Sequence, residues 1–145
     1  MQQTADRLIR LPLDDSKQNY LSGFWRWVEF LAADDYRGAI ESLYWAEPTS
    51  WTADALRRRV TTFFGGNSPW VVVIPNERLV AVVNDAAEFS PRTEENSGWF
   101  LAQIPLTTEP ADPKSDEIPL MGLACSFFVR ENAGALVMEH EIFHA

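Results

Sequence analysis

The chain has 145 residues, of which 46% are hydrophobic, and this combination suits one compact domain covering residues 1–145 with a substantial core. Its formal charge is −9, with 21 acidic residues against 12 basic residues, so we expect no binding to nucleic acid or anionic lipid through general electrostatics. Cys125 is the one cysteine, which excludes an intrachain disulfide. We expect it to be a small buried hydrophobe rather than a nucleophile.

Residues 1–15 lack the apolar run of a signal peptide. No window of the sequence approaches the roughly 18 apolar residues of a membrane span. We therefore expect a soluble, cytoplasmic protein without a membrane partner.

The first third of the chain has the apolar spacing of helices. An acidic cap at residues 14–16 can begin the first helix, and the acidic break at residues 34–35 separates it from the second. Pro48 ends the second helix, and Thr52 can cap a third, which the glycine pair at 65–66 closes. The side chains expected to face inward are Tyr20, Phe24, Trp27, Val28, Leu31, Tyr36, Ala39, Ile40, Leu43, Tyr44, Leu56, Val60, Phe63 and Phe64.

Later segments have the composition of strands. Trp70–Ile74 and Leu79–Val83 are β-branched runs on either side of Pro75-Asn76-Glu77-Arg78, which predicts a hairpin. A third strand is predicted at Trp99–Leu106, where Pro105 indicates an edge or a bulge.

The end of the chain is predicted to be a long loop followed by a second hairpin. Residues Thr107–Pro119 are rich in Pro, Asp and Glu and have little to bury. Strands at about Leu120–Val129 and Leu136–Phe143 then flank a turn at Asn132-Ala133-Gly134. Helices first and strands afterwards predict an α+β fold, with N-terminal helices packed on one face of a curved antiparallel sheet and a hollow between the two layers.

The segment His140-Glu141-Ile142-Phe143-His144 spells the zinc-peptidase pattern H-E-x-x-H and holds both histidines. In a helix the two imidazoles stand one turn apart and converge on one ion. On a strand they lie about 13 Å apart, at about 3.3 Å per residue, which no ion bridges. The hairpin pattern favours a strand, although a helix from Ala135 onward is the alternative. A catalytic zinc also needs a third ligand, normally taken from beyond the motif, so we predict no metal site and no cofactor.

Residues Phe30-Leu31-Ala32-Ala33-Asp34-Asp35-Tyr36, with Ala39, form an apolar helix, an acidic break and a second helix with a small residue facing inward. In this pattern the chain resembles the NTF2-like (cystatin-like) superfamily, which has a cone-shaped fold. The resemblance implies a pocket between sheet and helices, catalytic in some members, and a homodimer formed through the sheets. The isomerase and dehydratase motifs do not match here residue by residue, so no catalytic residue is transferred.

Three functions fit these features. The favoured one is a non-catalytic module that binds a small apolar ligand or a protein partner through its hollow or sheet face, although large aromatic side chains are more often plain core. The basic run Arg57-Arg58-Arg59 is expected to be a solvated helix side, with a phosphate or acidic partner as the alternative. The candidate ligand-binding residues are Tyr20, Trp27, Tyr44, Trp51, Trp70 and Trp99.

The second function is a pocket enzyme of the isomerase, dehydratase or hydrolase kind, in which burial raises the pKa of a carboxylate that acts as general base. Asp35, Asp85 and Glu88 lie near element ends, where caps and turns explain them equally well. The third is an acidic inhibitor or immunity-type protein, because a charge of −9 and an acidic loop at residues 109–117 would speed association with a basic partner.

Overall fold

The computed structural model describes residues 7–47, 49–63, 70–107 and 121–144. It confirms the three predicted N-terminal helices, and each begins at a polar side chain that accepts a hydrogen bond from a backbone amide. The predicted helix-end residues Phe64 and Gly65-Gly66, and Pro48, lie outside the described residues. The helices are α1 (Lys17–Ala32, capped by Ser16), α2 (Tyr36–Glu41, capped by Asp35) and α3 (Ala53–Thr61, capped by Thr52).

A fourth helix, α4 (Glu77–Ala86), occupies the segment predicted as the strand Leu79–Val83, so the first predicted hairpin is wrong. The Asn76 side chain accepts a hydrogen bond from the Leu79 amide at 2.9 Å, which makes it a helix cap rather than a turn residue. Val83 packs against the core from one face of α4. A β-branched run can therefore be helical with only part of its apolar surface against the core, since Val82 is exposed.

Within the described residues the sheet has five antiparallel strands in the order β1-β3-β4-β5, and β2 also pairs with β3. The strands predicted at residues 99–106, 120–129 and 136–143 are confirmed within the described part of the chain. The predicted strand at residues 70–74 shortens to two residues, and β2 was not predicted. The bounds are β1 Val71–Val72, β2 Glu88–Ser90, β3 Gly98–Thr107, β4 Met121–Asn132 and β5 Ala135–His144.

Pro105 lies where one side of β3 has little strand pairing. On that side β2 pairs with residues 99–101 and β1 with residues 106–107. The Pro105 carbonyl accepts a hydrogen bond from the Val73 amide at 3.1 Å, just beyond the end of β1. Because an antiparallel residue directs its N and its C=O towards the same neighbour, the missing N–H of Pro105 faces this short partner. The edge predicted from Pro105 is therefore present on one side of β3 only, because the other side of this strand pairs with β4. The predicted loop after Thr107 lies outside the described residues.

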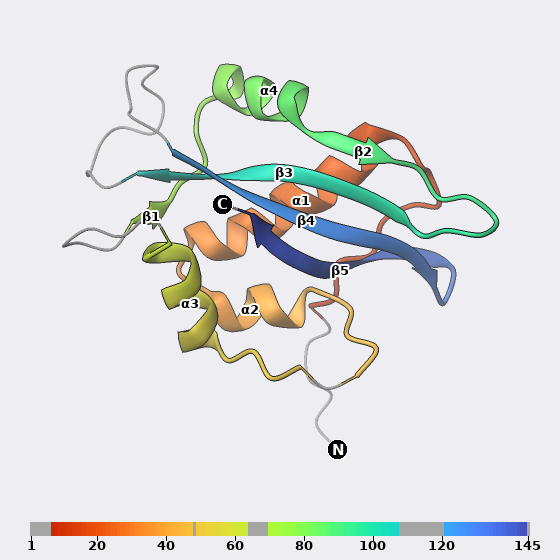
Figure 1. Ribbon diagram of the computed structural model, residues 1–145, viewed down its shortest axis with the longest axis horizontal. Helices are drawn as coiled ribbons and strands as arrows, with labels where there is room; N and C mark the ends of the chain where they lie inside the picture. The colour runs from red at the N-terminus through yellow and green to blue at the C-terminus, as the bar shows by residue number, and fades with distance from the viewer. Residues whose placement is uncertain (1–6, 48, 64–69, 108–120, 145) are drawn as a thin grey trace.

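Helix α1 packs against one face of the curved sheet, and the predicted α+β architecture is confirmed (Figure 1). Phe24 and Trp27 from α1 meet Phe127 of β4 at ring-centroid distances of 6.4 and 5.0 Å. Phe127 in turn stacks on Phe100 of β3 at 5.1 Å. All four side chains have 0% exposure, so much of the aromatic surplus of the sequence fills the space between helix and sheet.

The free edge of β5 is covered by two segments from the N-terminal half. Leu11 exchanges two backbone hydrogen bonds with Leu136, each 2.9 Å long, and the Tyr44 amide donates to the Met138 carbonyl at 2.8 Å. These bonds satisfy backbone groups that an open sheet edge would present to other chains. They also fix α2 beside β5.

Candidate functional site

The segment that carries the zinc-peptidase pattern is extended, as predicted. His140 to His144 belong to β5, and the register with β4 shifts between Ser126 and Phe127, leaving Glu141 as the extra residue of a bulge. Among the described residues, no group of three His, Cys, Asp or Glu side chains could hold a metal ion.

His140 is part of an aromatic cluster. Its ring centroid lies 4.7 Å from that of Phe143, 5.7 Å from that of Phe127 and 6.4 Å from that of Trp51. The Nε2 atom is buried and has no hydrogen-bond partner among the described residues. Burial lowers the pKa of His140 to about 4, with Glu141 opposing this shift and Arg59 adding to it. The imidazole is therefore neutral at physiological pH and acts as an aromatic packing group.

The Glu141 side chain lies on the face of the hairpin opposite to the His140 cluster. Its Oε1 atom accepts hydrogen bonds from the Trp99 indole at 2.8 Å and from the Ser126 hydroxyl at 2.7 Å. One carboxylate oxygen thus ties β3, β4 and β5 together at the bulge. Trp99 is one of the candidate ligand-binding residues. Its indole N–H is already hydrogen-bonded within the sheet, to Glu141.

The other candidate ligand-binding residues are dispersed through the molecule. Tyr20 and Trp27 are fully buried in the core, where their polar atoms donate to Asp15 at 2.6 Å and to the Ala39 carbonyl at 3.2 Å. Half-buried Tyr44 lies beside β5, and Trp51 belongs to the His140 cluster. Trp70 lines a surface pocket that the other five do not line. The structure therefore does not assemble the six into one ligand site.

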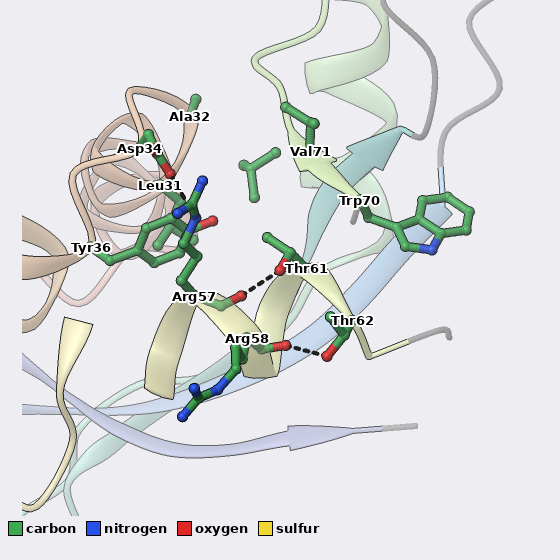
Figure 2. Close-up of a pocket in the computed structure, with 11 residues that line it drawn as sticks. Leu31, Ala32, Asp34, Tyr36, Arg57, Arg58, Thr61, Thr62, Trp70 and Val71 are labelled. Atoms are coloured by element: carbon green, nitrogen blue, oxygen red, sulfur yellow. Dashed lines mark hydrogen bonds and ion pairs between the residues drawn. The ribbon is translucent and has the colours of Figure 1, made fainter. Parts of the chain in front are cut away.

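This pocket, of about 420 Å³, opens between the C-terminal end of α1, helix α3 and strand β1 (Figure 2). Its apolar lining comes from the end of α1 and from the segment 70–72. Tyr36, Arg57 and Asp34 gather on one side, whereas Trp70 lies on the other. The lining residues are Leu31, Ala32, Asp34, Tyr36, Arg57, Arg58, Thr61, Thr62, Trp70, Val71 and Val72.

The polar side of the pocket results from the break between α1 and α2. Asp34 adopts a φ of 60° in this break, a left-handed conformation that Asp and Asn tolerate better than most residues. The turn places its Oδ1 atom 3.2 Å from the Nε atom of Arg57 on α3. Tyr36, which begins α2, is buried with its ring against the same pocket.

The three arginines of α3 have different surroundings. Arg57 pairs with Asp34, while the Arg58 guanidinium points away from the pocket in Figure 2. The Arg59 guanidinium lies 4.6 Å from the Phe63 ring centroid and 5.4 Å from that of Phe143. All three side chains are exposed, which agrees with the predicted solvated helix side. Arg57 has the additional role that the sequence did not indicate.

The groups that the sequence offers for catalysis are carboxylates and Cys125. None of the described Asp and Glu residues is buried. Asp35 caps α2 through the Gly38 amide at 2.9 Å, and Asp85 and Glu88 are exposed. Burial raises the pKa of the Cys125 thiol well above its ordinary value, so this buried cysteine is protonated and unreactive.

Comparison with family models, with curated proteins and with solved structures gives no match. Among the described residues, no helix has both the length and the apolar character that crossing a bilayer requires. Function is therefore inferred from the pocket and from the chemistry of the groups around it.

Proposed function

We propose that this protein is a non-catalytic binding module that takes a small, mainly apolar ligand in the pocket between α1, α3 and β1. The observation that carries the proposal is the pocket itself. Its volume of about 420 Å³ lies within the range of roughly 300–1,000 Å³ found for small-molecule sites. Leu31, Ala32 and Val72 supply apolar surface, and Trp70 supplies a large ring at one side.

The alternative of a pocket enzyme receives less support from the same geometry. A general base needs a carboxylate whose pKa is raised by burial. Among the described residues that line the pocket, Asp34 is the one carboxylate, and its side chain is 63% exposed and paired with Arg57. Because this carboxylate is exposed and ion-paired rather than buried, the site supports binding without chemical conversion better than catalysis.

Filling the pocket tests the proposal. N-Phenylnaphthylamine, an uncharged probe that fluoresces in apolar surroundings, should bind the wild-type protein saturably. Ala32→Phe places a ring at the pocket wall and should weaken probe binding by about tenfold, because a filled cavity cannot bury the probe. Ala86→Phe adds the same ring at an exposed position of α4 and should bind as the wild type does.

Binding that is equal in the wild type and both variants would refute the pocket as the ligand site. Circular dichroism and the unfolding midpoint of each variant show whether the fold is kept. Thr62→Phe fills the pocket from α3 instead of α1 and guards against a local effect at Ala32.

Membership of the NTF2-like superfamily also remains a proposal. The helices against a curved antiparallel sheet support it, as does the position of the acidic break between α1 and α2. A protein partner, a homodimer formed through the sheet face, an inhibitor or immunity role and a cytoplasmic location stay predictions from the sequence.

A further inference from the structure

We infer that the ligand of this pocket carries a carboxylate head group. Arg57 and Tyr36 bind this head group. When the ligand is absent, the side chain of Asp34 occupies the place of the head group beside Arg57. The inference rests on the proposed function and specifies the class of ligand: a small carboxylic acid with an apolar body. Three groups on one side of the pocket carry it.

Arg57 has hydrogen-bonding capacity that the described residues leave unused. A guanidinium has five N–H donors. The contact with Asp34 involves the Nε atom, at 3.2 Å. The two terminal nitrogens have no hydrogen bond to any residue that the structure describes. They form the planar fork that matches the two oxygens of a carboxylate.

Tyr36 supplies a second donor beside Arg57. The residue is 4% exposed and lines the pocket, yet its hydroxyl makes no hydrogen bond to the described part of the chain. Burial raises the pKa of Tyr36 to about 12, and the charges of Asp34 and Arg57 also act on the hydroxyl. The phenol therefore keeps its proton at neutral pH and can donate a hydrogen bond to an anion.

Asp34 is suited to compete with the ligand rather than to hold Arg57 permanently. The Arg57 and Asp34 side chains are 56% and 63% exposed, and ion pairs between such exposed groups are weak. A ligand carboxylate that is partly removed from water by the pocket wall gains a stronger contact with the same cation. When the ligand carboxylate replaces the Asp34 carboxylate beside Arg57, the positive charge of Arg57 still has a negative partner.

Charge favours a singly charged head over a phosphate. The chain has a net charge of −9, and Asp34 stands at the pocket rim. A doubly charged phosphate would meet more repulsion from both than a carboxylate does. The Arg57 guanidinium, which lies beside Tyr36 in the pocket, matches a single negative charge.

A matched pair of competitors tests the inference. Naphthylacetate and naphthylacetamide have the same apolar body and differ in the charge of the head. Each is titrated against bound N-phenylnaphthylamine. In the wild type the carboxylate should displace the probe at a concentration about fivefold lower than the amide, the ratio expected for one half-exposed charged hydrogen bond.

Two substitutions should move this ratio in opposite directions. Arg57→Gln should abolish the preference for the carboxylate, whereas Arg59→Gln, on the same helix but outside the lining of this pocket, should keep it. Asp34→Asn removes the competing charge and suits the left-handed backbone, so it should strengthen carboxylate binding about threefold. Asp54→Asn makes the same charge change at an exposed α3 position that does not line this pocket and should have no effect.

The outcomes separate the two proposals. If the uncharged probe binds and Ala32→Phe blocks it, but carboxylate and amide compete equally in all variants, the ligand class is wrong and the pocket stands. If the uncharged probe does not bind in the pocket, the proposed function is wrong and the inference that rests on it is overturned too.

Discussion

The buried imidazole of His140 should make the protein lose stability between pH 6.5 and pH 4. Its ordinary pKa is 6.5, and burial lowers the value to about 4 in the folded state. As the pH falls below 6.5, the unfolded chain therefore takes up a proton that the folded chain does not accept. Stability from the neutral ring is complete above pH 6.5 and is lost as the pH falls towards 4.

The size of the loss follows from the two pKa values. A difference between 6.5 and about 4 corresponds to about 3 kcal/mol when the titration is complete. Between pH 7.5 and pH 5 the expected loss is about 2 kcal/mol, since the folded ring is still largely neutral at pH 5. Asp15, whose hydrogen bond with Arg92 lowers its pKa, contributes at more acidic pH and leaves this window to the histidine.

Urea denaturation followed by tryptophan fluorescence at pH 5, 6 and 7.5 measures this slope. His140→Phe keeps an aromatic ring among Trp51, Phe127 and Phe143 and removes the titrating group. The variant should lose the slope and gain about 1–2 kcal/mol at pH 7.5, because a buried polar atom without a partner is no longer present. A His144→Gln variant reports how much of the slope comes from the other histidine. An undiminished slope in His140→Phe would show that its pKa is not lowered by burial.

Two further substitutions test the backbone of the sheet. Ala133 and Gly134 have φ values of 52° and 83° in the two-residue turn between β4 and β5, so Ala133→Asn should raise the free energy of unfolding by about 0.5–1 kcal/mol. Thermal denaturation against Ala133→Val, which should destabilise, checks this. At Gly98 an added methyl group would overlap the Tyr20 hydroxyl, so Gly98→Ala should cost about 2 kcal/mol. In the Gly98→Ala/Tyr20→Phe double variant the loss should be smaller than the sum of the single losses, and additive losses would contradict the contact.

The helices were predictable where capping residues and apolar spacing agree. Ser16 and Thr52 each accept a hydrogen bond from the amide three residues later, as the sequence suggested. At α4 the same capping geometry was present at Asn76, but the preceding Pro75 and the β-branched run after it favoured a hairpin. A run of Leu and Val has no decisive period over five residues, so its spacing alone could not separate a helix from a strand.

The pocket was not predictable from the sequence, because its polar side joins residues that are far apart along the chain. Asp34 meets Arg57 because the backbone turns at a left-handed residue. The sequence predicts a helix break at Asp34 and a solvated helix side at Arg57. Both predictions are correct, but neither indicates that the two residues meet. Their relative position depends on how α2 and α3 pack. Trp70 is the one predicted ligand-binding residue that this packing places in the pocket wall.

The position of the pocket also determines how a ligand could enter. The hollow expected between helices and sheet is filled by Phe24 and Trp27 against Phe100 and Phe127. The pocket lies instead at one end of α1, where exposed Arg57 and Asp34 stand at the rim (Figure 2). Exchange of one weak surface ion pair is then sufficient for entry, and the aromatic core does not have to open. Binding should accordingly order the side chains around α3 and β1 while leaving the packing between α1 and the sheet unchanged.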